Sequence, residues 1–150
     1  MKRIPPVLFY ILSWTWGLPM TLCGAAVLGF LRLRGVPLRR FGLCRYAEIG
    51  RFWGGLELGM FFLKDTASGV HVCLHESGHA IQNILLGPFM PLIVSIPSAI
   101  RYWYREIRRR RGKLLRGRYE DIWFEAHATA LGYRFFQPEI SEPIRTLPRK

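Results

Sequence analysis

His75-Glu76-Ser77-Gly78-His79 is the stretch that decides how the rest of this sequence is interpreted. On an α-helix, residues four positions apart lie on one face with their Cβ atoms about 6 Å apart, so His75 and His79 can direct two imidazoles at one ion. Two neutral imidazoles suit Zn²⁺, and the adjacent carboxylate of Glu76 can take a proton from a water that attacks a carbonyl. The pattern predicts a zinc site with Glu76 as general base.

The flanking residues predict a strand, a turn and then a helix around this motif. Leu56, Leu58, Met60 and Phe62 recur with a period of two, which indicates a strand over residues 53–64, as a short β-strand or hairpin. Asp65-Thr66-Ala67-Ser68-Gly69 supplies turn and N-cap residues. We expect the helix to begin near Ser68 and to end near Gly87-Pro88.

A catalytic zinc commonly has three protein ligands, so one more donor is needed. Glu125 lies in an apolar helical segment, where a metal would offset the cost of burying its carboxylate, and its face also carries Ala128, Thr129 and Gly132. We expect Glu125 to be the third ligand.

The other candidates for this role are weaker. His127 points to a different face from Glu125, and His71 lies about 12 Å along the helix axis from His79, so we expect a cap or supporting role for His71. Glu106 lies in an arginine run that predicts a local ion pair, Glu120 and Asp121 suit a helix start, and Glu139 and Glu142 fall in a proline-containing tail.

Residues 4–31 carry no charge and are long enough to cross a membrane, which needs roughly 20 apolar residues. We expect residues 1–34 to form an N-terminal membrane anchor with one transmembrane helix, although Pro5, Pro6 and Pro19 leave a helical hairpin open. The arginines that follow this run outnumber the basic residues before it, which predicts a cytoplasmic location for the rest of the chain.

Residues 35–136 are expected to form the remaining domain, followed by an irregular tail over residues 137–150. A second uncharged run, residues 80–100, contains Gly87, Pro88, Pro91 and Pro97, so residues 84–100 are expected to be interfacial or re-entrant. Residues 101–118 contain nine Lys or Arg and one acid, and residues 119–133 have a helical pattern that ends at Gly132.

The composition favours a membrane partner. Hydrophobic residues make up 50% of the 150 residues while the formal net charge is +12. Because no nucleic-acid-binding motif is present and the basic residues adjoin apolar runs, we expect membrane lipids, anionic ones included, and not nucleic acid. Three widely spaced cysteines, Cys23, Cys44 and Cys73, predict buried reduced thiols and not a disulfide framework.

Several stretches resemble a poorly characterised group of bacterial membrane-associated zinc metallopeptidases. They are Thr15-Trp16-Gly17-Leu18-Pro19, Leu58-Gly59-Met60-Phe61-Phe62, His75-Glu76-Ser77-Gly78-His79-Ala80-Ile81-Gln82, Leu86-Gly87-Pro88, Ile96-Pro97-Ser98 and Trp123-Phe124-Glu125-Ala126. More broadly, the sequence is similar to the gluzincins, in which two histidines and a downstream glutamate bind zinc. The resemblance implies a membrane protein of the bacterial inner membrane.

The expected fold is therefore α+β, a mainly helical, membrane-associated, zincin-like domain with an N-terminal transmembrane helix. The expected function is a membrane-anchored zinc metallopeptidase that hydrolyses peptide or protein substrates, with the strand over residues 56–63 as the edge on which a substrate lies. One alternative is a non-catalytic membrane adaptor with a structural zinc and a basic lipid- or partner-binding segment. An intramembrane protease is a third, weakened because no second membrane segment carries an Asp.

Overall fold

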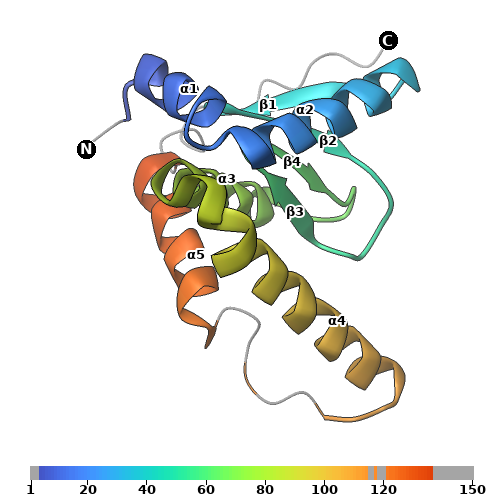
Figure 1. Cartoon of the computed structure of the whole chain (residues 1–150). Helices are drawn as coiled ribbons and strands as arrows, with labels where there is room; N and C mark the ends of the chain where they lie inside the picture. The colour runs from blue at the N-terminus through green and yellow to red at the C-terminus, as the bar shows by residue number, and fades with distance from the viewer. Residues whose placement is uncertain (1–3, 115–116, 118–120, 137–150) are drawn as a thin grey trace.

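The computed structural model describes residues 4–114, 117 and 121–136, which fold as an α+β unit (Figure 1). Its helices are α1 (Pro6–Trp14), α2 (Leu18–Leu33), α3 (Val70–Leu86), α4 (Ile96–Arg110) and α5 (Trp123–Phe136), with a 3₁₀ turn η1 (Gly87–Phe89) and a π-helical turn η2 (Pro91–Ser95). Its strands are β1 (Leu38–Phe41), β2 (Cys44–Glu48), β3 (Gly55–Leu58) and β4 (Phe61–Lys64).

The four strands form one sheet in the order β1-β2-β4-β3. The expected single strand over residues 53–64 is a hairpin, β3 antiparallel to β4, with Gly59 at φ +73° in the turn. Gly59 also lies against the backbone of Thr21 in α2, where a side chain would clash. The hairpin alternative is thus confirmed, and of its two strands β3 lies at an edge of the sheet while β4 lies inside it. Strands β1 and β2 were not expected.

The expected single helix over residues 4–31 is wrong, because the chain breaks into α1 and α2, which are bent by 92°. Pro19 occupies the first turn of α2, where a proline is tolerated, and Gly17 precedes it. The Gly17 carbonyl accepts a hydrogen bond from Asn83 Nδ2 of α3 at 3.2 Å. Phe9 of α1 is fully buried in the same cluster as Phe62 and Leu74, so these helices pack on the rest of the fold.

Among the described residues, no single helix combines the length and the apolar character needed to cross a membrane. Two pairs of consecutive helices have that length and composition when the two helices of each pair are taken together. They cover residues 6–33 and residues 70–110, and the helices of the second pair meet at an angle of 114°.

Helix α3 follows the turn at Asp65 and ends at Gly87, close to the predicted limits. The Asp65 carboxylate organises that turn by accepting hydrogen bonds from the backbone of Trp53, Gly54, Ala67 and Ser68. Beyond α3 the chain reverses through η1 and η2 into α4, so the interruption expected over residues 84–100 is present as a bend.

Helix α5 packs against α3, and α3 also contacts β3 and β4, so α3 lies between α5 and the sheet. Helix α5 continues to Phe136, past the predicted end at Gly132. Gly132 lies against the Leu74 carbonyl inside the helix pair, so this glycine serves close packing and does not end the helix. Cys44 and Cys73 are buried free thiols, as expected, whereas Cys23 is exposed. The expected tail over residues 137–150 lies outside the described residues.

Candidate metal centre

His75 and His79 occupy successive turns of α3 on the face toward α5. Their ring centroids are 4.7 Å apart, and their Nε2 atoms are 3.2 Å apart. The spacing of four residues on a helix gives this convergence directly, as the sequence predicted.

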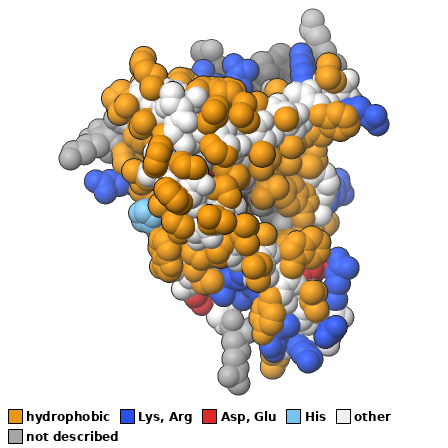
Figure 2. Space-filling model, viewed as in Figure 1, with side chains coloured by type: hydrophobic (Ala, Val, Ile, Leu, Met, Phe, Trp, Pro, Cys, Tyr) orange, Lys and Arg blue, Asp and Glu red, His pale blue; other side chains and the backbone are white. Residues whose placement is uncertain are grey.

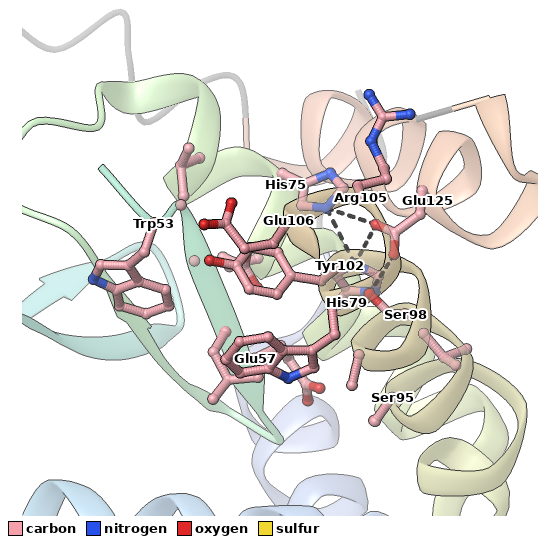
Figure 3. A pocket seen from close by; sticks show the side chains of 18 of the residues that line it. Trp53, Glu57, His75, His79, Ser95, Ser98, Tyr102, Arg105, Glu106 and Glu125 are labelled. Carbon is pink, nitrogen blue, oxygen red and sulfur yellow. Dashed lines mark hydrogen bonds and ion pairs between the residues drawn. The ribbon is translucent and has the colours of Figure 1, made fainter. Parts of the chain in front are cut away.

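Glu125 of α5 completes the group. Its Oε2 atom lies 3.0 Å from His75 Nε2 and 3.2 Å from His79 Nε2, and its side chain is fully buried (Figure 3). One ligand atom from each of these residues lies within 4.8 Å of the others, an arrangement that could hold a metal ion. The predicted set of three residues is therefore brought together.

Two glycines allow α5 to approach α3 this closely. A Cβ at Gly78 would lie 1.8 Å from the Ala128 carbonyl oxygen, and one at Gly132 would lie 2.0 Å from that of Leu74. This close packing brings the backbone of α5 near enough for Glu125 to reach both histidines.

Gln82 fixes the tautomer of His79. The Gln82 amide nitrogen donates to the Phe124 carbonyl at 2.8 Å, so the Gln82 oxygen is the atom that faces His79 Nδ1, at 2.7 Å. Because that oxygen only accepts, the proton of a neutral His79 is on Nδ1. The Nε2 lone pair then faces Glu125, which is the orientation that a metal ligand needs.

Two hydroxyl groups support the other ligands. Thr129 Oγ1 lies 2.8 Å from Nδ1 of His75, and Ser98 Oγ of α4 donates to Oε1 of Glu125 at 2.5 Å. The Ser98 contact leaves Oε2 of Glu125 turned toward the two imidazoles. Each ligand is therefore held through the atom that points away from the proposed ion.

Burial alone would raise the pKa of the Glu125 carboxyl, but the contacts with the imidazoles of His75 and His79 in their protonated forms, together with the hydrogen bond from Ser98, outweigh that effect and hold the pKa well below its usual range. A buried site with two imidazole nitrogens and one carboxylate oxygen fits a divalent metal cation in both donor chemistry and charge.

Glu76 is buried beside this group, against the edge strand. Its carboxylate lies where a side chain at Gly55 would be, so the glycine makes room for it. The backbone N–H of Glu57 donates to the Glu76 carboxylate. Burial raises the pKa of Glu76 to about 7, with the nearby His75 opposing that shift and Glu125 adding to it.

The three residues and Glu76 line a cavity of about 670 Å³ (Figure 3). One wall is the segment from Trp53 to Glu57 that leads into and forms β3, and the opposite wall is the inner side of α4 with Ser98, Tyr102 and Arg105. The candidate metal ligands therefore face an open space bordered by a sheet edge.

The remaining candidates lie outside the ligand group. His71 is exposed near the start of α3, 3.1 Å from the Tyr133 hydroxyl, and it does not cap the helix with its side chain. His127 Nδ1 accepts a hydrogen bond from Gln82 at 3.2 Å, so His127 contacts a residue that supports His79 and is not a member of the ligand group. Glu106 forms the expected ion pairs with Arg109 and Arg110, while its helix lines the cavity.

The sequence prediction gave no supporting role to Gln82, Ser98 or Thr129, although it placed Thr129 on the same helix face as Glu125. Two of them carry a local signal, because Gln82 follows His79 by three residues and Thr129 follows Glu125 by four, both of which are same-face spacings on a helix. Ser98 carries none, since its contact with Glu125 depends on the bend between α3 and α4.

Comparison of the chain with protein-family models, with curated proteins and with solved structures found no match.

Proposed function

We propose that this protein is a zinc metallopeptidase that hydrolyses peptide bonds, with His75, His79 and Glu125 as zinc ligands and Glu76 as general base. The observation that carries the proposal is the convergence of these three ligand atoms beside Glu76 at the base of a cavity. The resemblance of six stretches between Thr15 and Ala126 to bacterial membrane-associated zinc metallopeptidases points in the same direction.

Zinc is the metal that this donor set suits best. Two imidazoles with one carboxylate are a known ligand set of catalytic zinc, whereas Mg²⁺ and Ca²⁺ prefer oxygen ligands alone. A zinc ion bound there would supply Lewis-acid chemistry, polarising a carbonyl oxygen and making a water easier to deprotonate.

Glu76 is placed to move the proton. Its carboxylate lines the cavity, and the Glu57 N–H and the close contact with Gly55 hold it against β3. In the proposed reaction the carboxylate accepts a proton from the attacking water and returns it to the leaving amine.

The outer edge of β3 supports a polypeptide substrate. Because β3 is the last strand of the sheet, no other strand pairs with its free side. The Glu57 N–H already donates to Glu76, but an extended chain can pair with the remaining backbone groups of such an edge. The segment from Trp53 to Glu57 lines the cavity, so a peptide in this position would pass close to Glu76.

The Glu76→Gln variant tests the proposal. With zinc-loaded protein and a mixture of unstructured peptides analysed by mass spectrometry, we expect unchanged zinc content and a loss of hydrolysis on the order of 10²–10⁴-fold. Glu106→Gln, a cavity-lining carboxylate that is already paired with arginines, is the matched control and should keep activity. Equal cleavage by wild type and Glu76→Gln would contradict the proposal.

The second candidate is a non-catalytic membrane adaptor with a structural metal, and the exposed basic helix α4 is the observation that favours it. A structural zinc site is closed by four protein ligands, whereas the described part of the chain supplies three ligands that face a cavity, which supports the peptidase. Zinc binding without cleavage of any peptide by wild type would favour the adaptor.

The proposal includes a place at the bacterial inner membrane with the catalytic part in the cytoplasm. Its grounds are the apolar N-terminal helices and the excess of arginine over residues 32–51 and 101–118.

A further inference from the structure

Helix α4 has two faces, and only one of them is turned toward the metal centre. Ser98 donates to Glu125, and Tyr102 and Arg105 line the cavity. At about 100° per residue these positions fall within one narrow sector of the helix. This sector is the inner face of α4.

The opposite face is an apolar stripe that no other described residue buries. It consists of Ile96, Ile100, Trp103, Tyr104 and Ile107, which follow one another at helical spacing on one side of α4. Their exposed fractions reach 65% for Ile100 and 58% for Trp103, and α4 has no buried residue. We call these five residues the outer face.

The outer face continues into neighbouring elements. Phe89, Leu92 and Ile93 of η1 and η2 extend the exposed stripe toward α3. In Figure 2 hydrophobic side chains cover the side of the molecule that carries α1, α2 and the first part of α4, and Lys and Arg side chains gather at the far end of α4. Exposed apolar surface of this extent marks an interaction surface.

The charges beside the stripe identify the occupant. Residues 101–113 contain seven Lys or Arg against the single acid Glu106, and Arg108 lies over the ring of Tyr104, 5.6 Å from its centroid. A second copy of the chain would bring like charges together at a two-fold interface. The surface of a bilayer with anionic lipids matches both features, because its phosphate groups attract the arginines and its apolar layer accepts the outer face. Trp and Tyr side chains favour the boundary between these two layers.

We propose that the outer face of α4 lies in the surface of a bilayer that contains anionic lipids. Trp103 belongs to the outer face and also lines the cavity, so the rim of the cavity borders the lipid. The metal site then opens along the membrane surface, where it meets protein segments that lie on or emerge from the bilayer. The lipid contact does not require catalysis, so it can be tested whether or not the protein cleaves peptides.

An environment-sensitive fluorophore attached to a single cysteine reports the position of each face. The Cys23→Ser background leaves only the buried Cys44 and Cys73, and either Ile100→Cys or Arg105→Cys then adds one accessible site. These two sites lie about 140° apart around the helix. The full chain is reconstituted in nanodiscs of phosphatidylethanolamine with phosphatidylglycerol, or of phosphatidylcholine alone, and zinc binding confirms that each variant is folded.

In the anionic discs we expect a blue-shifted emission at position 100 and several-fold stronger quenching by quencher-bearing lipids there than at position 105. The difference should shrink in phosphatidylcholine discs. A label at Ile107→Cys should behave like the one at position 100, which guards against a local effect of either substitution. Equal quenching at positions 100 and 105 overturns the proposal. A blue shift in the absence of lipid also overturns the proposal. If that shift grows with protein concentration, a second copy of the chain covers the outer face. If it is independent of protein concentration, another segment of the same chain covers it.

Discussion

The side-chain oxygen of Gln82 lies 2.7 Å from Nδ1 of His79, while the Gln82 amide nitrogen donates to the Phe124 carbonyl. This contact sets the tautomer of His79 from within α3, and the bond to Phe124 ties the same amide to the segment that carries Glu125. The orientation of one metal ligand and the docking of the other therefore depend on one side chain.

The Gln82→Ala variant should bind zinc more weakly. Without an acceptor at Nδ1, His79 can place its proton on either nitrogen and turn its ring, and loss of such supporting partners lowers metal affinity by about 10–100-fold. Competition titration against a chelator measures the change. Gln82→Glu keeps an acceptor for His79 and should lose less affinity than Gln82→Ala, and His71→Ala, outside the ligand group, should bind like wild type. Unchanged affinity in Gln82→Ala would show that the contact does not orient the ligand.

The close approach of α3 and α5 predicts a second effect. In Gly78→Ala the new methyl group would lie 1.8 Å from a backbone oxygen, so the helices must separate, and we expect a loss of about 3 kcal/mol in the free energy of unfolding. Zinc affinity should fall with it because Glu125 is carried on the displaced helix. Both are measurable, by denaturant unfolding of the metal-free protein and by metal titration.

Gly29 provides the matched control for this substitution. It also lies inside a helix, yet a methyl group added at that position would meet no other atom within 4 Å. Gly29→Ala should therefore gain roughly 0.5–1 kcal/mol, since alanine favours a helix over glycine. Equal stability changes at the two glycines would mean that the helices are not in close contact.

The three cysteines should differ in their reactivity toward thiol reagents, and this difference tests whether the core is packed as the structure shows. Burial raises the pKa of Cys44 to about 12 and that of Cys73 to about 11, so neither is a thiolate near neutral pH, while Cys23 is exposed. N-ethylmaleimide should modify one cysteine in the folded protein and three after unfolding, as counted by mass spectrometry. The Cys23→Ser variant should take up none while folded. Rapid modification of Cys73 in folded protein would contradict the observed packing of α3 against the sheet.

What the sequence could predict depended on whether the deciding interaction was local. The spacing of His75 and His79 is local to one helix, and Glu125 stood out as a carboxylate in an apolar helix, so the ligand group was predictable. The break at Gly17 was foreseen only as an alternative, from Pro19, because the Asn83 side chain that docks Gly17 lies 66 positions away. Strand β2 was missed for a related reason: Arg45 and its neighbours look like the basic flank of a membrane segment until their pairing with β1 and β4 is known.

The buried carboxyl of Glu57 predicts a stability that falls as the pH rises. Burial raises its pKa well above the usual range, the Gly59 N–H opposes that shift, and the nearby Glu76 adds to it. A carboxyl whose pKa is raised by folding contributes stability below its unfolded pKa of about 4, and this contribution is lost as the pH rises toward the folded value.

The Glu57→Gln variant isolates this contribution. Its amide oxygen can still accept the hydrogen bond from the Gly59 N–H, and it carries no charge to bury. Urea unfolding of the metal-free proteins should give similar stabilities near pH 4 and a growing advantage for Glu57→Gln at higher pH, by at most about 1.4 kcal/mol per pH unit. Glu106→Gln should show the opposite pH dependence. The hydrogen bonds from Arg110 and Arg109 lower the pKa of Glu106, so the ionised Glu106 contributes stability at pH values above its unfolded pKa. The substitution removes that contribution, so Glu106→Gln should be less stable than wild type at higher pH. A difference between Glu57→Gln and wild type that stays constant from pH 4 to pH 8 would mean that Glu57 ionises normally, and that the edge of β3 beside Glu76 is open to water.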